Sequence, residues 1–216
     1  LGSLLIPCAR ATAVAAGGAL AVDRHRFSDL VTEHIQNHPN ITIIQERVTA
    51  LPKRCAVIAT GPLTDGALAE DLERQCGKRL SFFDAAAPIV SYESLDPEKI
   101  FFAARYDRGD ADYINCPMDQ ETYTAFYQAL IAAERAPLHD CDKEFFRVYE
   151  GCMPIEVLAS RGEDTMRFGP LKPVGLRDPK TGHRPYAVVQ LRRENQSGSL
   201  YNLCLLYTSP NPRDRG

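Results

Sequence analysis

The chain has 216 residues, of which 44% are hydrophobic and 25% are charged, a composition typical of a folded protein and not of a disordered one. The formal net charge is -3, which excludes a strong overall basic field, so any nucleic-acid binding would depend on a local patch. The seven cysteines form neither a CxxC pair nor a zinc-like spacing with histidine, and no apolar run is long enough to cross a bilayer. These features favour a cytoplasmic protein with reduced thiols, without a metal site or a membrane segment, and leave the oligomeric state open.

The first forty residues predict mainly helix. Residues 1–14 read as the end of a helix, and Gly17 with Gly18 then predicts a tight turn. Residues 25–38 place their apolar side chains on one face at helical spacing, and Pro39 ends the pattern.

Two strands are predicted next. Residues 41–48 are rich in β-branched side chains, and residues 55–59 are short and wholly apolar, as a buried parallel strand would be. A helix over residues 65–76, capped by Thr64 or Asp65, follows. This alternation of helices and strands predicts an α/β arrangement.

The pattern changes after about residue 81, where aromatic residues and prolines become frequent. Residues 119–134 predict an amphipathic helix capped by Asp119. Strand-like segments follow at residues 165–169 and 185–192, so this half predicts an α+β unit. Residues 205–216 show no periodicity and are interpreted as a tail outside the core.

Two features could carry chemistry. Gly61 follows the predicted buried strand, at the edge where open α/β sheets bind ligands, although an ordinary turn explains it as well. Cys152 lies between a glycine and a Met-Pro pair, where irregular backbone is expected, and Arg161 nearby could favour its thiolate. A buried structural cysteine is the alternative, and Cys116 in its Asn-Cys-Pro-Met context raises the same question.

Basic residues concentrate in the second half of the chain. A solvated surface and a local binding patch are equally compatible with that concentration. The residues are Lys172, Arg177, Lys180, Arg184, Arg192 and Arg193.

Five stretches, taken in order, resemble one family. They are Gly17–Arg24 (GGALAVDR), Glu150–Glu156 (EGCMPIE), Phe168–Gly175 (FGPLKPVG), Pro185–Leu191 (PYAVVQL) and Leu200–Leu203 (LYNL). The chain resembles the methylenetetrahydrofolate–tRNA-(uracil-5-)-methyltransferases, the TrmFO family, over nearly all of residues 1–204. These enzymes are related to the larger GidA-type flavoproteins that modify tRNA.

The resemblance implies a bacterial cytoplasmic enzyme that forms 5-methyluridine in the T loop of tRNA. It implies FAD as cofactor, 5,10-methylenetetrahydrofolate as carbon donor, and NADH or NADPH as reductant. The implied fold is α/β, with a partial FAD-binding Rossmann-like domain over residues 1–83, an α+β inserted domain on the substrate and tRNA side over residues 84–204, and an unrelated tail over residues 205–216.

The chain departs from the family pattern at both ends. The GxGxxG fingerprint that cradles a dinucleotide is absent, the first residue is Leu, and the family pattern stops at Cys204. We therefore expect an internal fragment of a longer enzyme that is inactive in isolation and poorly soluble.

The resemblance also implies site residues. Cys152 matches the proposed nucleophile, which would add to carbon 6 of uracil, and Cys116 ranks below it. The residues implied in FAD binding are Val48, Ala59, Thr60 and Gly61, with Asp84 and Pro88 beside the flavin ring.

Three other functions compete with this interpretation. The first is a GidA-type enzyme that modifies the wobble uridine of tRNA, which the EGCMPIE stretch disfavours. The second is a non-catalytic module that binds RNA or protein, in which every cysteine is structural. The third is a flavin oxidoreductase that does not act on RNA.

Overall fold

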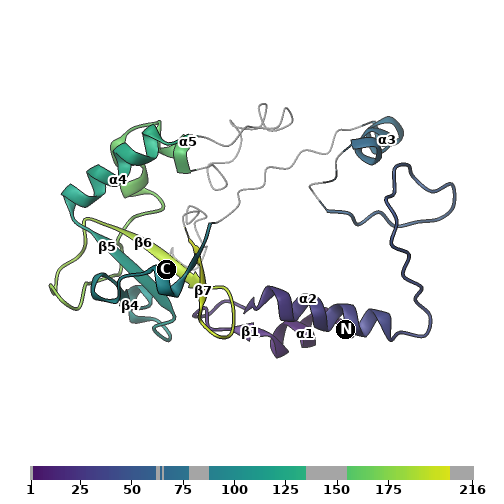
Figure 1. Cartoon of the computed structure of the whole chain (residues 1–216), viewed down its shortest axis with the longest axis horizontal. Coiled ribbons are helices and arrows are strands. Elements are labelled where there is room, and N and C mark those ends of the chain that lie inside the picture. The colour runs from purple at the N-terminus through teal and green to yellow at the C-terminus, as the bar shows by residue number, and fades with distance from the viewer. Residues whose placement is uncertain (1, 62–63, 65, 78–87, 135–154, 205–216) are drawn as a thin grey trace.

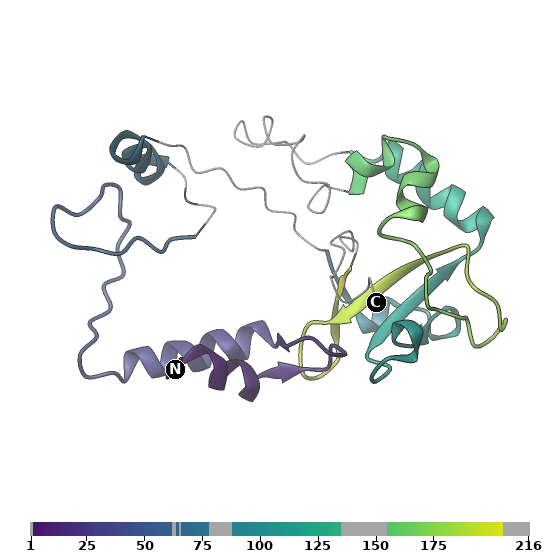
Figure 2. The same ribbon diagram turned by 180° about the vertical axis from the view of Figure 1, so that it is seen from behind.

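The computed structural model describes residues 2–61, 64, 66–77, 88–134 and 155–204 (Figure 1). Figures 1 and 2 show an N-terminal helical pair, a helix that stands apart, and a sheet with helices at one end. The buried hydrophobic residues concentrate in the sheet unit.

Two helices and two short antiparallel strands form the N-terminal unit. They are α1 (Leu5–Ala11), β1 (Ala13–Val14), β2 (Ala21–Val22) and α2 (Arg24–Gln36). The carboxylate of Asp23 accepts a hydrogen bond from the Arg26 backbone N–H at 3.2 Å and caps α2. The helix expected over residues 25–38 is therefore confirmed, with its start set by this cap.

The strands expected over residues 41–48 and 55–59 are not formed. Both segments are irregular and exposed: Ile44 is 70% exposed and Val57 is 91% exposed. A parallel strand is stabilised by hydrogen bonds to its neighbours, and no described residue pairs with either segment. The prediction was wrong because apolar composition specifies a strand only where a partner strand is present.

Helix α3 (Gly66–Cys76) confirms the helix expected over residues 65–76, whose alternative cap, Asp65, lies outside the described residues. The carboxylate of Asp71 holds the preceding loop by accepting from the Leu51 backbone N–H at 2.7 Å. Arg74 forms an ion pair with the same carboxylate at 3.2 Å. The loop and α3 thus form one local unit.

The main sheet has five strands in the order β3-β7-β6-β5-β4, and every pair in it is antiparallel. Its strands are β3 (Ile89–Ser91), β4 (Phe101–Phe102), β5 (Tyr113–Met118), β6 (Ala187–Arg193) and β7 (Leu200–Leu203). Short 3-10 helices join the first strands at Tyr92–Ser94, Pro97–Lys99 and Arg105–Asp107. The predicted strand over residues 185–192 is confirmed as β6, whereas the parallel arrangement expected for the first half is absent from the described residues.

Three helices lie at one end of the sheet. They are α4 (Gln120–Ala132), α5 (Ile155–Ala159) and α6 (Glu163–Phe168), and Figure 1 labels the first two. Asp119 caps α4 by accepting from the Thr122 N–H at 2.8 Å, which confirms the helix expected over residues 119–134. The prediction of a strand over residues 165–169 is wrong, because most of these residues belong to α6. Gly162 precedes this helix, and the two acidic residues of its first turn stabilise its N-terminus.

The core beneath these helices joins α4, α5, α6 and the ends of two strands. Its buried members are Met118, Tyr123, Leu158, Ala159, Met166, Leu171 and Ala187. The phenol of Tyr123 also donates a hydrogen bond to the Glu163 carbonyl, so its polar tip is paired. The predicted boundary between residues 83 and 84 and the predicted tail over 205–216 lie outside the described residues.

This packing predicts a contrast between two leucines. Leu171 is 0% exposed and Leu20 is 56% exposed. Leu171→Ala should lower the free energy of unfolding by about 2–5 kcal/mol, because it removes buried methyl groups and leaves a cavity. Leu20→Ala should change it by less than about 0.5 kcal/mol. Urea denaturation followed by circular dichroism measures both, and equal losses would contradict the core assignment.

Candidate functional site

A clamped loop over residues 169–186 connects α6 to β6 and packs against the sheet through Leu176, which clusters with Phe101 and Val188. The guanidinium of Arg105 donates through Nη1 to the carbonyls of Lys172 at 2.8 Å and Val174 at 2.9 Å. The backbone N–H of Tyr106 donates to the Gly175 carbonyl at 2.7 Å. Two adjacent residues thereby hold three carbonyls of the loop over residues 169–186.

The clamp is anchored to a buried amide pair on the sheet. Arg105 Nε donates to Gln190 Oε1 at 3.3 Å, and Gln190 Nε2 donates to Asn115 Oδ1 at 3.1 Å. Asn115 in turn donates to the Ala103 carbonyl at 3.1 Å. Because buried amides are costly when unpaired, this chain of bonds fixes Arg105 relative to β5 and β6.

Backbone geometry at the clamp requires a glycine. Gly175 has φ +69°, and a Cβ there would lie 2.8 Å from the backbone nitrogen of Tyr106. Tyr106 itself has φ 59°, which is uncommon for a residue with a side chain. A side chain at position 175, where the FGPLKPVG stretch ends, would therefore clash with Tyr106.

The first pocket beside the loop, the Arg167 pocket, has a volume of about 430 Å³. Its lining residues are Arg167, Phe168, Lys172, Pro173, Arg184, Pro185 and Tyr186. The guanidinium carbon of Arg167 lies 4.0 Å from the ring centroid of Tyr186 and 4.7 Å from that of Phe168. Arg167 forms an ion pair with Asp164 at 3.6 Å, which leaves Lys172 and Arg184 as the unpaired cations of this pocket among the described residues. Together with the two aromatic rings they make the pocket attractive to an anion that carries a flat ring.

The second pocket, the His183 pocket, has a volume of about 490 Å³ and shares Arg184 with the first. Its lining residues are Ala103, Ala104, Tyr106, Asp107, Gly175, Leu176, Arg177, His183 and Arg184. Asp107 is the single carboxylate among these lining residues. The two pockets thus form one basic surface over the clamped loop.

The predicted basic cluster is brought together only in part. Lys172 and Arg184 have no ion-pair partner within the described part of the chain and line the Arg167 pocket. Lys180 is neutralised by Glu98, whose carboxylate lies 3.2 Å from its ammonium. Arg192 and Arg193 belong to β6 and do not line either pocket. The sequence analysis did not identify Arg167 as a site residue. The aromatic Phe168 beside it and the Gly-Pro pair that follows are the sequence features that could have indicated a binding surface there.

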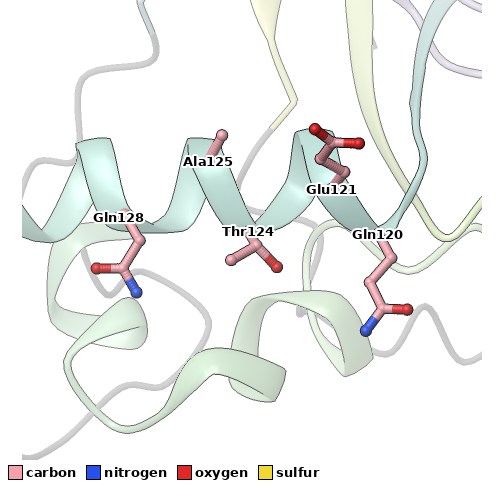
Figure 3. A pocket seen from close by; sticks show the side chains of 5 residues that line it. All are labelled: Gln120, Glu121, Thr124, Ala125 and Gln128. Atoms are coloured by element: carbon pink, nitrogen blue, oxygen red, sulfur yellow. The ribbon is translucent and has the colours of Figure 1, made fainter.

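A third pocket of about 580 Å³ lies along α4 (Figure 3). Its lining residues are Gln120, Glu121, Thr124, Ala125 and Gln128. Thr124 donates to the carboxylate of Glu163 at 3.1 Å across the helices. These lining residues include a carboxylate but no cation, so this pocket does not fit a polyanion.

The cysteines differ in accessibility. Cys116 lies on β5, not on irregular backbone, and burial raises the pKa of its thiol to about 11. Burial also raises the pKa of Cys204. Both environments favour the neutral thiol and oppose nucleophilic chemistry. Cys152, the expected nucleophile, lies outside the described residues.

The residues expected to bind FAD are not brought together. Val48 is 48% exposed, and Ala59, Thr60 and Gly61 lie on exposed irregular backbone. Thr60 contacts Thr64 through their hydroxyl oxygens at 2.6 Å, while Pro88 precedes β3 in the sheet unit. Asp84 lies outside the described residues. Val48, Ala59, Thr60 and Gly61 thus form neither a strand edge nor a backbone cradle for the phosphates of a flavin.

The GGALAVDR stretch instead joins the N-terminal unit to the sheet unit. The Gly17 N–H donates to the Asp112 carboxylate at 2.7 Å, and the Tyr113 hydroxyl donates to the Ala16 carbonyl at 3.0 Å. Asp23 accepts from the Gln196 N–H at 3.2 Å as well as capping α2. The backbone N–H groups of Arg26 and Gln196 lower the pKa of Asp23. This stretch therefore has a structural role at the junction.

The family model described as "Glucose inhibited division protein A" matches residues 1–213. The chain belongs to this family. Its curated relatives include proteins named methylenetetrahydrofolate–tRNA-(uracil-5-)-methyltransferase TrmFO from Shouchella clausii, Listeria innocua and Bacillus pumilus, which are 58%, 55% and 54% identical over 204 residues. The match covers 94% of this chain and confirms the resemblance read from its motifs.

The chain spans 46% of the length of each of these three relatives. No helix in the described ranges has the length and apolarity needed to cross a membrane. Within those same ranges, no group of His, Cys, Asp and Glu is arranged to hold a metal ion.

Burial predicts contrasting reactivity for two thiols. With its pKa at about 11, roughly one in a thousand Cys116 side chains carries the thiolate at pH 8. Cys55 is exposed. Iodoacetamide should label Cys55 in the folded chain and Cys116 only after urea is added. Peptide mass spectrometry locates the label, and rapid labelling of native Cys116 would contradict its burial.

Proposed function

We propose that this chain is part of a folate- and FAD-dependent methyltransferase that forms 5-methyluridine in the T loop of tRNA. The observation that carries the proposal is 54–58% identity over 204 residues to relatives named for that activity. Since the chain spans 46% of those relatives, the activity is proposed for a protein of their length, and this chain alone is expected to be inactive.

The chemistry assigns a role to Cys152. Carbon 5 of uracil is a weak nucleophile, and addition of the Cys152 thiolate to carbon 6 would generate an enolate that attacks the one-carbon unit from 5,10-methylenetetrahydrofolate. Loss of the proton at carbon 5 would break the bond to the folate nitrogen, release tetrahydrofolate and leave an exocyclic methylene group. Reduction of that group would expel the Cys152 thiolate from carbon 6 and restore the ring. NADH or NADPH would supply the hydride equivalent that converts the methylene carbon into a methyl group.

The geometry supports a division of roles within such an enzyme. The residues expected to bind FAD form no cradle for a flavin, so FAD would be held mainly by the remainder of a protein of the relatives' length. The sheet unit offers the basic surface, and α5 begins at Ile155, within the EGCMPIE stretch and three residues after Cys152. We therefore assign residues 84–204 to the tRNA side. The assignment of residues 1–83 to the cofactor side rests on the family resemblance, with the rest of a longer protein supplying most of the FAD contacts.

A GidA-type wobble-uridine modifier is less well supported. The family model that matches the chain carries the GidA description, but the curated relatives at 54–58% identity are named as uracil-5 methyltransferases. The products separate the two, since one carries a methyl group on carbon 5 and the other carries a carboxymethylaminomethyl group.

The first test replaces Cys152 in a protein extended to the length of the relatives. Cys152→Ala should reduce formation of 5-methyluridine by at least about a hundredfold, because the covalent step cannot occur. Cys116→Ala is the matched control and should leave the rate within about threefold. Nucleoside mass spectrometry of a tRNA transcript measures the product, and full activity of the Cys152→Ala protein would refute the nucleophile assignment.

The second test concerns the cofactor. The 216-residue chain, incubated with FAD and desalted, should show no flavin absorbance in the visible spectrum, because the expected binding residues are exposed and separated. A protein of the relatives' length should retain about one flavin per chain. Retention of stoichiometric flavin by the short chain would mean that these residues form a flavin site on their own.

A further inference from the structure

We propose that the Arg167 pocket binds an unpaired nucleotide of RNA, with the base against Phe168 and the adjoining phosphates on Lys172 and Arg184. The proposal deepens the proposed function, because it places contact with the RNA substrate on the clamped loop. The lining residues come from two of the stretches that carry the family resemblance, FGPLKPVG and PYAVVQL, together with Arg167 and Arg184 beside them.

Stacking is the first argument. Phe168 is 62% exposed at the mouth of the pocket, where a large aromatic ring loses hydrophobic stabilisation by facing water. Arg167 lies close to Phe168 and Tyr186, and its Nε is buried without a hydrogen-bond partner among the described residues. A base laid on this aromatic and guanidinium surface would cover the exposed ring, as in single-stranded RNA recognition.

Charge is the second argument. The chain carries a net charge of -3, yet Lys172 and Arg184 are exposed cations without an ion-pair partner in the described residues. Arg184 also lines the His183 pocket with Arg177 and His183, so positive charge continues beyond the base site. Spaced cations on one surface follow a phosphate backbone, whereas an isolated small anion would need only one of them.

Preorganisation is the third argument. Arg105 and Tyr106 hold the loop carbonyls, and the Leu171 N–H donates to the Met166 carbonyl at 2.9 Å. The Val188 N–H donates to the Leu171 carbonyl at 3.0 Å, which ties the loop to β6. A rigid binding surface loses little conformational entropy when ligand binds, so a few stacking and phosphate contacts suffice for measurable affinity.

The experiment titrates the 216-residue chain into a fluorescein-labelled RNA hairpin with an unpaired loop, and separately into a fully paired RNA duplex of the same length. Fluorescence anisotropy should show saturable binding that is tighter for the hairpin. Phe168→Ala should weaken hairpin binding at least about fivefold, the low end expected for loss of one base stack. Arg184→Ala should weaken it and reduce the magnitude of the salt slope by about 0.7, the value for one phosphate contact to a single strand.

Lys180→Ala is the matched control, because it removes one positive charge from the same loop where Glu98 already neutralises it. It should leave the dissociation constant within about twofold. Circular dichroism spectra and thermal melts of all three variants confirm that they fold. Equal losses in Lys180→Ala and Arg184→Ala, equal binding to the duplex, or no saturable binding would each overturn the proposal.

The same variants in a protein of the relatives' length separate this inference from the proposed function. If RNA binding requires Phe168 and Arg184 but no 5-methyluridine forms, the binding surface stands and the methyltransferase assignment fails. If methylation proceeds with an unchanged KM in both variants, the methyltransferase assignment stands and the pocket is not its RNA contact.

Discussion

The hydrogen bonds of Arg105 are the interaction on which the candidate site depends. One guanidinium links the Gln190–Asn115 pair of the sheet to two carbonyls of the loop over residues 169–186. No strand forms within this loop, so sheet hydrogen bonds do not hold it in place. Guanidinium donors have fixed directions, so the loop is positioned as well as attached. Both basic pockets are built against this loop, and their shape depends on the hydrogen bonds of Arg105, which is not among the lining residues of either pocket.

The sequence predicted the elements whose determinants are local. Helices α2 and α4 begin at Asp23 and Asp119, whose carboxylates accept from the third residue along, and such caps are readable from the residues themselves. The strands expected over residues 41–48 and 55–59 were not formed, because strand formation depends on partners elsewhere in the chain. The composition of residues 165–169 predicts a strand. Gly162 and the two acidic residues that follow it instead mark the start of a helix.

The candidate site shows the same division between local and long-range information. Lys172 and Arg184 were recognisable as part of a basic cluster, but nothing in their spacing indicated that Lys180 between them would be neutralised by Glu98, 82 residues away. Arg167 was overlooked because its role comes from rings on both sides, one adjacent in sequence and the other, Tyr186, brought close by β6. The family resemblance identified these stretches in the sequence. The fold shows that GGALAVDR connects the N-terminal unit to the sheet unit and that FGPLKPVG contributes lining residues to the Arg167 pocket.

The three-carbonyl clamp has a consequence for the timing of motion in this region. Because Arg105 and Tyr106 are neighbours, loss of one of these bonds would weaken the hold on the other two carbonyls, and the loop would open as a single cooperative unit. A ligand bound in one pocket would stabilise the closed loop and so disfavour opening at the other pocket. Ligands in the two pockets, whose linings share only Arg184, would therefore be coupled through one local folding equilibrium.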